Sequence, residues 1–184
     1  MPIPTSSGCG LRAQSLSDAA PALSPPAPRR RFFWSIAVPA HSESRILPYT
    51  TDLMYAIVAD VERYPQFVPW CAGLRVLSRE KQGGRETMIA ETLVGYKSLR
   101  ERYISRVLLD PVARTVDVVQ TEGPFRQLEN HWRFSPEGES CRVEFSILFE
   151  FRSRMLGMVA AAVLGPVMSR MTDAFEARAR ELAK

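Results

Sequence analysis

The chain has 184 residues, of which 46% are hydrophobic and 24% are charged, and its formal net charge is +4 at pH 7. This composition excludes a chain that is disordered throughout, allows one domain with a sizeable core, and forces no nucleic-acid-binding function. The three cysteines, Cys9, Cys71 and Cys141, are odd in number and widely spaced, unlike a disulfide framework or a zinc site.

Residues 1–40 differ in composition from the rest of the chain. They hold seven of the fourteen prolines, six serines and four arginines, but a single acidic residue, Asp18. Segments rich in Arg and Ser and poor in acids are typical of organelle transit peptides. Four prolines between 21 and 28 prevent a continuous helix there, so a disordered or wrongly assigned N-terminus is the alternative. We predict a mitochondrial transit extension over 1–40 and a folded domain over 41–184.

The domain begins with a short strand over Arg45–Leu47, followed by a helix that Thr51 or Asp52 caps. The predicted apolar face of this helix consists of Leu53, Met54, Ile57, Val58 and Val61. Residues 64–71, YPQFVPWC, follow as an aromatic loop, in which Pro65 and Pro69 leave room for one helical turn. Two interpretations of this loop stay open: a rigid gate that touches a membrane, or a plug for the end of the sheet.

Six further strands are predicted by alternating apolar and polar residues that end at turns rich in Gly, Pro or Asp. Their ranges are 74–79, 86–94, 98–109, 115–121, 128–134 and 141–151. The last is the clearest, because Cys141, Phe145 and Phe149 share one face and Glu144 lies on the other.

A long helix over 153–184 ends the chain, since apolar residues recur there about every four positions. Gly165 and Pro166 predict a kink in it. Residues 155–169 carry no charge, but about 15 residues are fewer than the roughly 20 that cross a bilayer.

These elements predict an α+β fold in which a curved antiparallel sheet wraps around the C-terminal helix. The sheet and the helix would leave an elongated hydrophobic cavity between them, and the methionines of the helix suit an irregular apolar space. Ordinary core packing of those methionines is the alternative.

The order of elements resembles the helix-grip arrangement of the START-like, polyketide cyclase-like superfamily. Within it, the chain is similar to the coenzyme Q-binding family. The residues that carry the resemblance are VERYPQFVPWC (61–71), ERYISRV (101–107), GPFRQLENHWRFSP (123–136), VEFSILFEFRS (143–153) and AFEARA (174–179).

The resemblance implies a tunnel that binds ubiquinone and a carrier role in respiration and ubiquinone biosynthesis. It also implies a peripheral location on the matrix side of the mitochondrial inner membrane, with a biosynthetic or respiratory complex as partner and no nucleic acid. The expected tunnel residues are Phe67, Val68, Trp70, Met88, Val94, Phe125, Leu128, Trp132, Phe145, Phe149, Met155, Val159, Val163 and Met171. The expected membrane contacts are Tyr64, Phe67, Trp70, Arg152 and Arg154. A related bacterial branch, described as a toxin that blocks ribosomal subunit association, gives the first alternative function.

A cavity enzyme of the cyclase or hydrolase type is the second alternative. The histidines are His41 and His131, and His131 faces water if Trp132 faces inward. Cys71 and Cys141 are predicted to be structural thiols. Glu91, Glu101 or Asn130 could point inward and bond a quinone oxygen, but no acid–base pair or metal-ligand spacing is visible. We predict a ligand carrier without catalytic residues, metal or catalytic cofactor.

Overall fold

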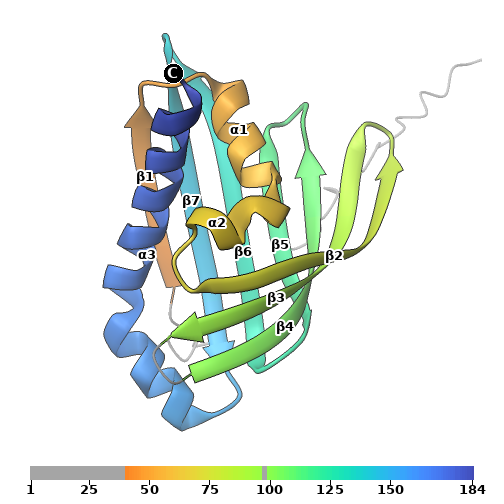
Figure 1. Ribbon diagram of the computed structural model, residues 1–184, viewed down its shortest axis with the longest axis vertical. Helices are drawn as coiled ribbons and strands as arrows, with labels where there is room; N and C mark the ends of the chain where they lie inside the picture. Colours follow the sequence, from red (N-terminus) through yellow and green to blue (C-terminus); the bar gives the residue numbers. More distant parts are fainter. Residues whose placement is uncertain (1–39, 97–98) are drawn as a thin grey trace, which may run out of the picture. The chain divides into compact units, whose positions relative to one another are not determined.

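The computed structural model describes residues 40–96 and 99–184, so residues 1–39 of the predicted extension lie outside the described part. Within it, one antiparallel sheet has the strand order β1-β7-β6-β5-β4-β3-β2 (Figure 1). The strands are β1 (Ala40–Leu47), β2 (Cys71–Gln82), β3 (Arg85–Tyr96), β4 (Leu99–Asp110), β5 (Thr115–Glu122), β6 (Phe125–Glu137) and β7 (Ser140–Phe151). The predicted strand count and sheet type are confirmed, although most strands are longer than predicted. Each predicted turn therefore joins two neighbouring strands as a hairpin, and β1 is the edge strand next to β7.

The helices occupy two places in the chain, between β1 and β2 and after β7. They are α1 (Thr51–Ala59), the 3₁₀ turn η1 (Val61–Arg63), α2 (Tyr64–Phe67) and α3 (Arg154–Leu182). The single turn of α2 within YPQFVPWC is confirmed. The predicted cap of α1 is wrong by one residue, because extended Thr50 accepts a hydrogen bond from the Leu53 amide at 3.2 Å.

Helix α3 is confirmed as one long helix, and it continues through Pro166. Figure 1 shows its axis bending along its length, as expected for a helix with an internal proline. Polar contacts tie it to β1: Arg45 Nη1 lies 2.7 Å from Asp173 Oδ1 and 3.5 Å from Glu176 Oε2, and Thr172 Oγ1 donates to Glu43 Oε2 at 3.2 Å. In the described part of the chain, no helix combines the length and the apolarity needed to cross a bilayer.

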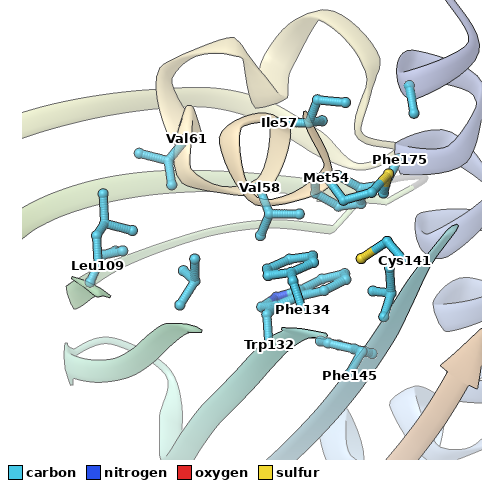
Figure 2. Close-up of a cluster of buried hydrophobic side chains, with 14 of the residues drawn as sticks. Met54, Ile57, Val58, Val61, Leu109, Trp132, Phe134, Cys141, Phe145 and Phe175 are labelled. Carbon is cyan, nitrogen blue, oxygen red and sulfur yellow. The ribbon is translucent and has the colours of Figure 1, made fainter. Parts of the chain in front are cut away.

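The hydrophobic core fills the space where α1 and the C-terminal half of α3 meet the sheet (Figure 2). Met54 and Val58 of α1 are buried toward Trp132 of β6. The Trp132 ring centroid lies 4.2 Å from that of Phe145 and 5.1 Å from that of Phe175 on α3. Burying one large apolar side chain contributes roughly 1.5–3 kcal/mol, so this cluster fixes both helices on the sheet.

Candidate functional site

A cavity of about 280 Å³ lies beside this core, between the inner face of the sheet, the segment from η1 to the start of β2, and helix α3. Trp132, Phe145 and Phe175 belong both to the core and to the cavity wall, so the packed interior ends at these rings. The wall is formed by Val61, Tyr64, Val68, Pro69, Trp70, Cys71, Leu74, Ala90, Thr92, Val94, Tyr103, Ser105, Val107, Val118, Phe125, Leu128, Asn130, Trp132, Phe145, Ile147, Phe149, Phe151, Val167, Met168, Met171 and Phe175. A largely apolar cavity with few polar groups is the usual form of a small-molecule site.

A second group of aromatic rings forms part of the cavity wall, on β4, β6 and β7. The Phe125 ring centroid lies 4.5 Å from that of Phe151, 5.8 Å from that of Tyr103 and 6.5 Å from that of Phe149. These tilted and edge-on contacts are the arrangement that aromatic pairs prefer. This part of the wall therefore consists of aromatic rings in contact with one another, which suits a flat apolar ligand.

The loop YPQFVPWC holds Trp70 in an unusual backbone conformation. Its φ is 65°, in the left-handed region that bulky residues avoid at a cost of about 1–2 kcal/mol. The Cys71 amide donates to the Val68 carbonyl at 3.2 Å, and the Gly95 amide on β3 donates to the Trp70 carbonyl at 2.9 Å. These bonds hold the loop against β3 with Trp70 in the cavity wall. The sequence carries no signal for this conformation.

The half-buried Tyr64 side chain points its hydroxyl into the domain. The hydroxyl donates to the Val58 carbonyl, and the ring centroid lies 5.2 Å from that of Phe175. Burial raises the pKa of the Tyr64 phenol, so the group stays neutral. The Phe67 ring also packs edge-on against the Phe175 ring, with 5.2 Å between the ring centroids. This half of the loop therefore packs against the core, and both predicted interpretations of the loop stay predictions.

Nine of the predicted tunnel residues line the cavity. They are Val68, Trp70, Val94, Phe125, Leu128, Trp132, Phe145, Phe149 and Met171. Three others are not part of the wall of this cavity: Phe67 and Met88 pack in or against the core, and the Met155 side chain is 67% exposed. The cause is that periodicity identifies the inward face of an element but not whether that face meets packed side chains or empty space. The side chains of Val159, Val163 and Arg154 lie outside the described part of α3.

Several wall residues are not among the predicted tunnel residues, and most are recoverable from strand alternation. Thr92 lies two residues before Val94, and Ile147 lies between Phe145 and Phe149 on the same face of β7. Tyr103 and Val118 face inward in the same way on β4 and β5. The inward face of each of these strands therefore lines the cavity over more of its length than the predicted residues cover.

Asn130 is a polar residue in an apolar row of the inner face. The strand register places Met88, Val107, Val118, Asn130 and Ile147 side by side across five strands. The Oδ1 atom of Asn130 is buried and has no hydrogen-bond partner among the described residues. An unsatisfied buried polar group costs about 1–3 kcal/mol.

The two glutamates that were predicted to share this inward role are placed differently. Glu91 forms ion pairs with Arg102 at 2.6 Å and Arg75 at 3.0 Å, on the face opposite the cavity-lining Thr92. Glu101 lies opposite Val94 in the register but is not part of the cavity wall. Asn130 alone of the three reaches the cavity.

The ionisable groups of the described wall are Tyr64, Tyr103 and Cys71, and each is held neutral at pH 7. Burial raises the pKa of the Tyr103 phenol, and it raises the pKa of the Cys71 thiol to about 11. His131 is exposed, with Nδ1 2.8 Å from Asp117 Oδ1, while Trp132 faces inward as predicted. The chemistry that this wall offers is apolar contact and hydrogen bonding to a neutral ligand.

Comparisons with known proteins agree with this arrangement. Residues 47–176 match the family model described as polyketide cyclase/dehydrase and lipid transport. The chain therefore belongs to this START-like family, and the predicted fold class and superfamily are confirmed.

Its relatives include coenzyme Q-binding proteins and ribosome association toxins. The mitochondrial coenzyme Q-binding protein COQ10 homolog B of Xenopus laevis is 34% identical over 184 residues, covering 94% of this chain and 74% of that protein. The ribosome association toxin RatA of Rickettsia prowazekii is 34% identical over 144 residues, covering 77% and 96%. The solution structure of protein CC1736 from Caulobacter crescentus has a TM-score of 0.69 at 42% identity, covering 79% and 98%. The resemblance to coenzyme Q-binding proteins is confirmed, and the toxin branch is related to a similar degree.

Proposed function

We propose that the protein binds ubiquinone in the cavity and carries it as a lipid chaperone, without transforming it. The observation that carries this proposal is the neutral, ring-lined cavity beneath α3. The coenzyme Q-binding names of two mitochondrial relatives, one from Xenopus laevis and one from Schizosaccharomyces pombe, support the ligand class.

The cavity volume limits how much of such a ligand is enclosed. A cavity of about 150 Å³ is sufficient for benzene, so 280 Å³ takes the substituted quinone ring and the first part of its tail. Each buried methylene contributes about 0.8 kcal/mol, so the rest of a polyprenyl tail needs further apolar surface. Met155 and Met158, 67% and 70% exposed in the first turns of α3, provide such surface.

The same surface supports a peripheral position on a membrane. Apolar Met155 and Met158 lie near the start of α3, close in sequence to exposed Arg152, whose Nε donates to the Phe125 carbonyl at 3.1 Å. Apolar side chains beside a basic one suit an anionic lipid surface, at about 1 kcal/mol per basic residue. We propose the matrix side of the mitochondrial inner membrane, which the predicted transit extension and the mitochondrial relatives support.

Mass spectrometry of lipids extracted from the untagged protein, purified from its own membranes, tests the proposal. We expect a prenylated quinone at close to one molecule per chain, and none in a matched preparation of an unrelated soluble protein. Repeated purification without a quinone, together with failure to bind added quinone, would contradict the proposal.

Association with ribosomal subunits is a second candidate, favoured by the equal 34% identity to the RatA toxin. Sedimentation of cell extracts through sucrose gradients separates the two. A carrier stays in the lipid fractions, whereas a ribosome-binding protein moves with a subunit and is released by high salt.

A further inference from the structure

We infer that the Asn130 amide is the hydrogen-bonding anchor for the ligand's ring oxygen, and that it holds the oxidised quinone and the reduced quinol with similar affinity. This inference rests on the proposed quinone-binding function and adds the group that recognises the ring. It begins from the position of Asn130 in the wall of the cavity.

Apolar residues surround Asn130 on the inner face of the sheet. Val118 and Ile147 lie beside it on the neighbouring strands, and Leu128 and Trp132 precede and follow it on the same face of β6. None of these four side chains accepts a hydrogen bond from an amide nitrogen, and only the Trp132 indole carries a donor. The buried Oδ1 indeed lacks a partner among the described residues. Buried amide groups normally have hydrogen-bond partners, so a bound ligand could supply the partner that this amide lacks.

Gln120 on β5 shows that an unpartnered oxygen alone does not make an anchor. Its Oε1 is also buried without a partner, but its Nε2 donates to the Phe125 carbonyl at 3.0 Å. The oxygen faces Gly123, where an added Cβ would lie 2.8 Å from it, and Gln120 is not part of the cavity wall. The Gln120 amide is therefore fixed by the β5–β6 turn, whereas the Asn130 amide borders empty space.

A side-chain amide offers a donor at one end and an acceptor at the other, exchanged by a half rotation about its terminal bond. A quinone carbonyl accepts from the Nδ2 end, and a quinol hydroxyl donates to the Oδ1 end. Because the Asn130 Oδ1 atom has no hydrogen-bond partner among the described residues, the rotation breaks no hydrogen bond of that oxygen. One residue therefore serves both redox states, which suits a carrier that has to release either form.

The test uses ubiquinone with a decyl tail and its quinol, titrated into the full-length protein under anaerobic conditions by calorimetry. Wild-type protein is expected to bind both forms within about threefold. Asn130→Leu is expected to weaken both by about tenfold, the usual effect of one lost hydrogen bond to a buried partner. Asn130→Asp, when ionised, offers acceptors only, so it is expected to weaken the quinone more than the quinol.

The thermal stability of the ligand-free protein separates this role from a structural one. Asn130→Leu removes an unsatisfied polar group and is expected to raise the melting temperature while it lowers affinity. Gln120→Leu, the matched control outside the wall, is expected to leave both affinities unchanged. Unchanged affinities in Asn130→Leu would overturn the anchor but not the proposed function. The anchor would also be overturned if Asn130→Leu lowered the melting temperature and Gln120→Leu lost as much affinity as Asn130→Leu. A wild-type protein that binds neither form would overturn the proposed function and the anchor together.

Discussion

Replacing Ala90 with phenylalanine is expected to block ligand binding without unfolding the protein. Ala90 lies on the inner face of β3, is 1% exposed and forms part of the cavity wall. The register places it between Val76 of β2 and Ser105 of β4, so a larger side chain at this position extends into the cavity.

The magnitude follows from the volume of the cavity. A ring of benzene size needs about 150 Å³, which is about half of the 280 Å³ available. At about 24 cal/mol per Å³ of cavity filled, the gain is at most about 3–4 kcal/mol. Lost rotamer freedom and imperfect fit oppose it, so we expect the free energy of unfolding to rise by about 1 kcal/mol. In an interior without a cavity, the same substitution would lower the free energy of unfolding by about 1–3 kcal/mol. The sign of the change in this free energy therefore shows whether the cavity is present.

Two measurements check this prediction: denaturant unfolding, and quenching of tryptophan fluorescence by added quinone, which Trp70 and Trp132 in the wall should report. Ala90→Phe should reduce quinone affinity by at least about a hundredfold, because the ring and the ligand compete for one volume. Leu93→Phe, on the opposite face of β3 and 40% exposed, is the matched control and should change neither quantity. A free energy of unfolding that falls by about 1 kcal/mol or more in Ala90→Phe, or unchanged quinone binding, would refute the reasoning.

Three further predictions concern the helix, its attachment and the wall. Phe175→Ala should lower the free energy of unfolding by about 3–5 kcal/mol in denaturant titration, because Phe175 is 3% exposed and contacts the rings of the core. Burial alone would raise the pKa of the Glu43 carboxyl, but its hydrogen bond with Arg45 and the charge of Arg45 lower it below 4.5. Stability from this carboxylate is therefore present above pH 4.5 and lost as the pH falls further, so the melting temperatures of wild type and Glu43→Gln should converge in acid. Cys71, with a pKa of about 11, should react slowly with iodoacetamide at pH 7.5 and more slowly still with quinone bound, whereas equal rates with and without ligand would place the ligand elsewhere.

The sequence predicted the sheet well, because each strand repeats with period two and ends at a turn residue. Alternation in β7 placed Cys141, Phe145 and Phe149 on the inner face, and all three are buried. The cap of α1 was missed because three adjacent residues, Thr50, Thr51 and Asp52, all have side chains that cap helices, and only the backbone geometry selects Thr50.

The inward-facing residues of the candidate site could be predicted from the sequence, but the position of the cavity among them could not. Met88 and Asn130 share one row of the inner face, yet Met88 is packed in the core and Asn130 borders the cavity. Trp70, which has a left-handed backbone, accepts a hydrogen bond from the Gly95 amide on β3, 25 residues further along the chain. Contacts between segments distant in the chain decide such features.

By itself, the sequence determined which side of the clearest strand, β7, avoids water and that one long helix is available to cover that side. Both are consequences of local periodicity, since an apolar face has to be buried wherever it lies. Only the tertiary structure decided where the covering helix touches the sheet and where it stands away from it. Large rings at Trp132, Phe145 and Phe175 fill one part of the interior, and the space next to them stays open for a ligand.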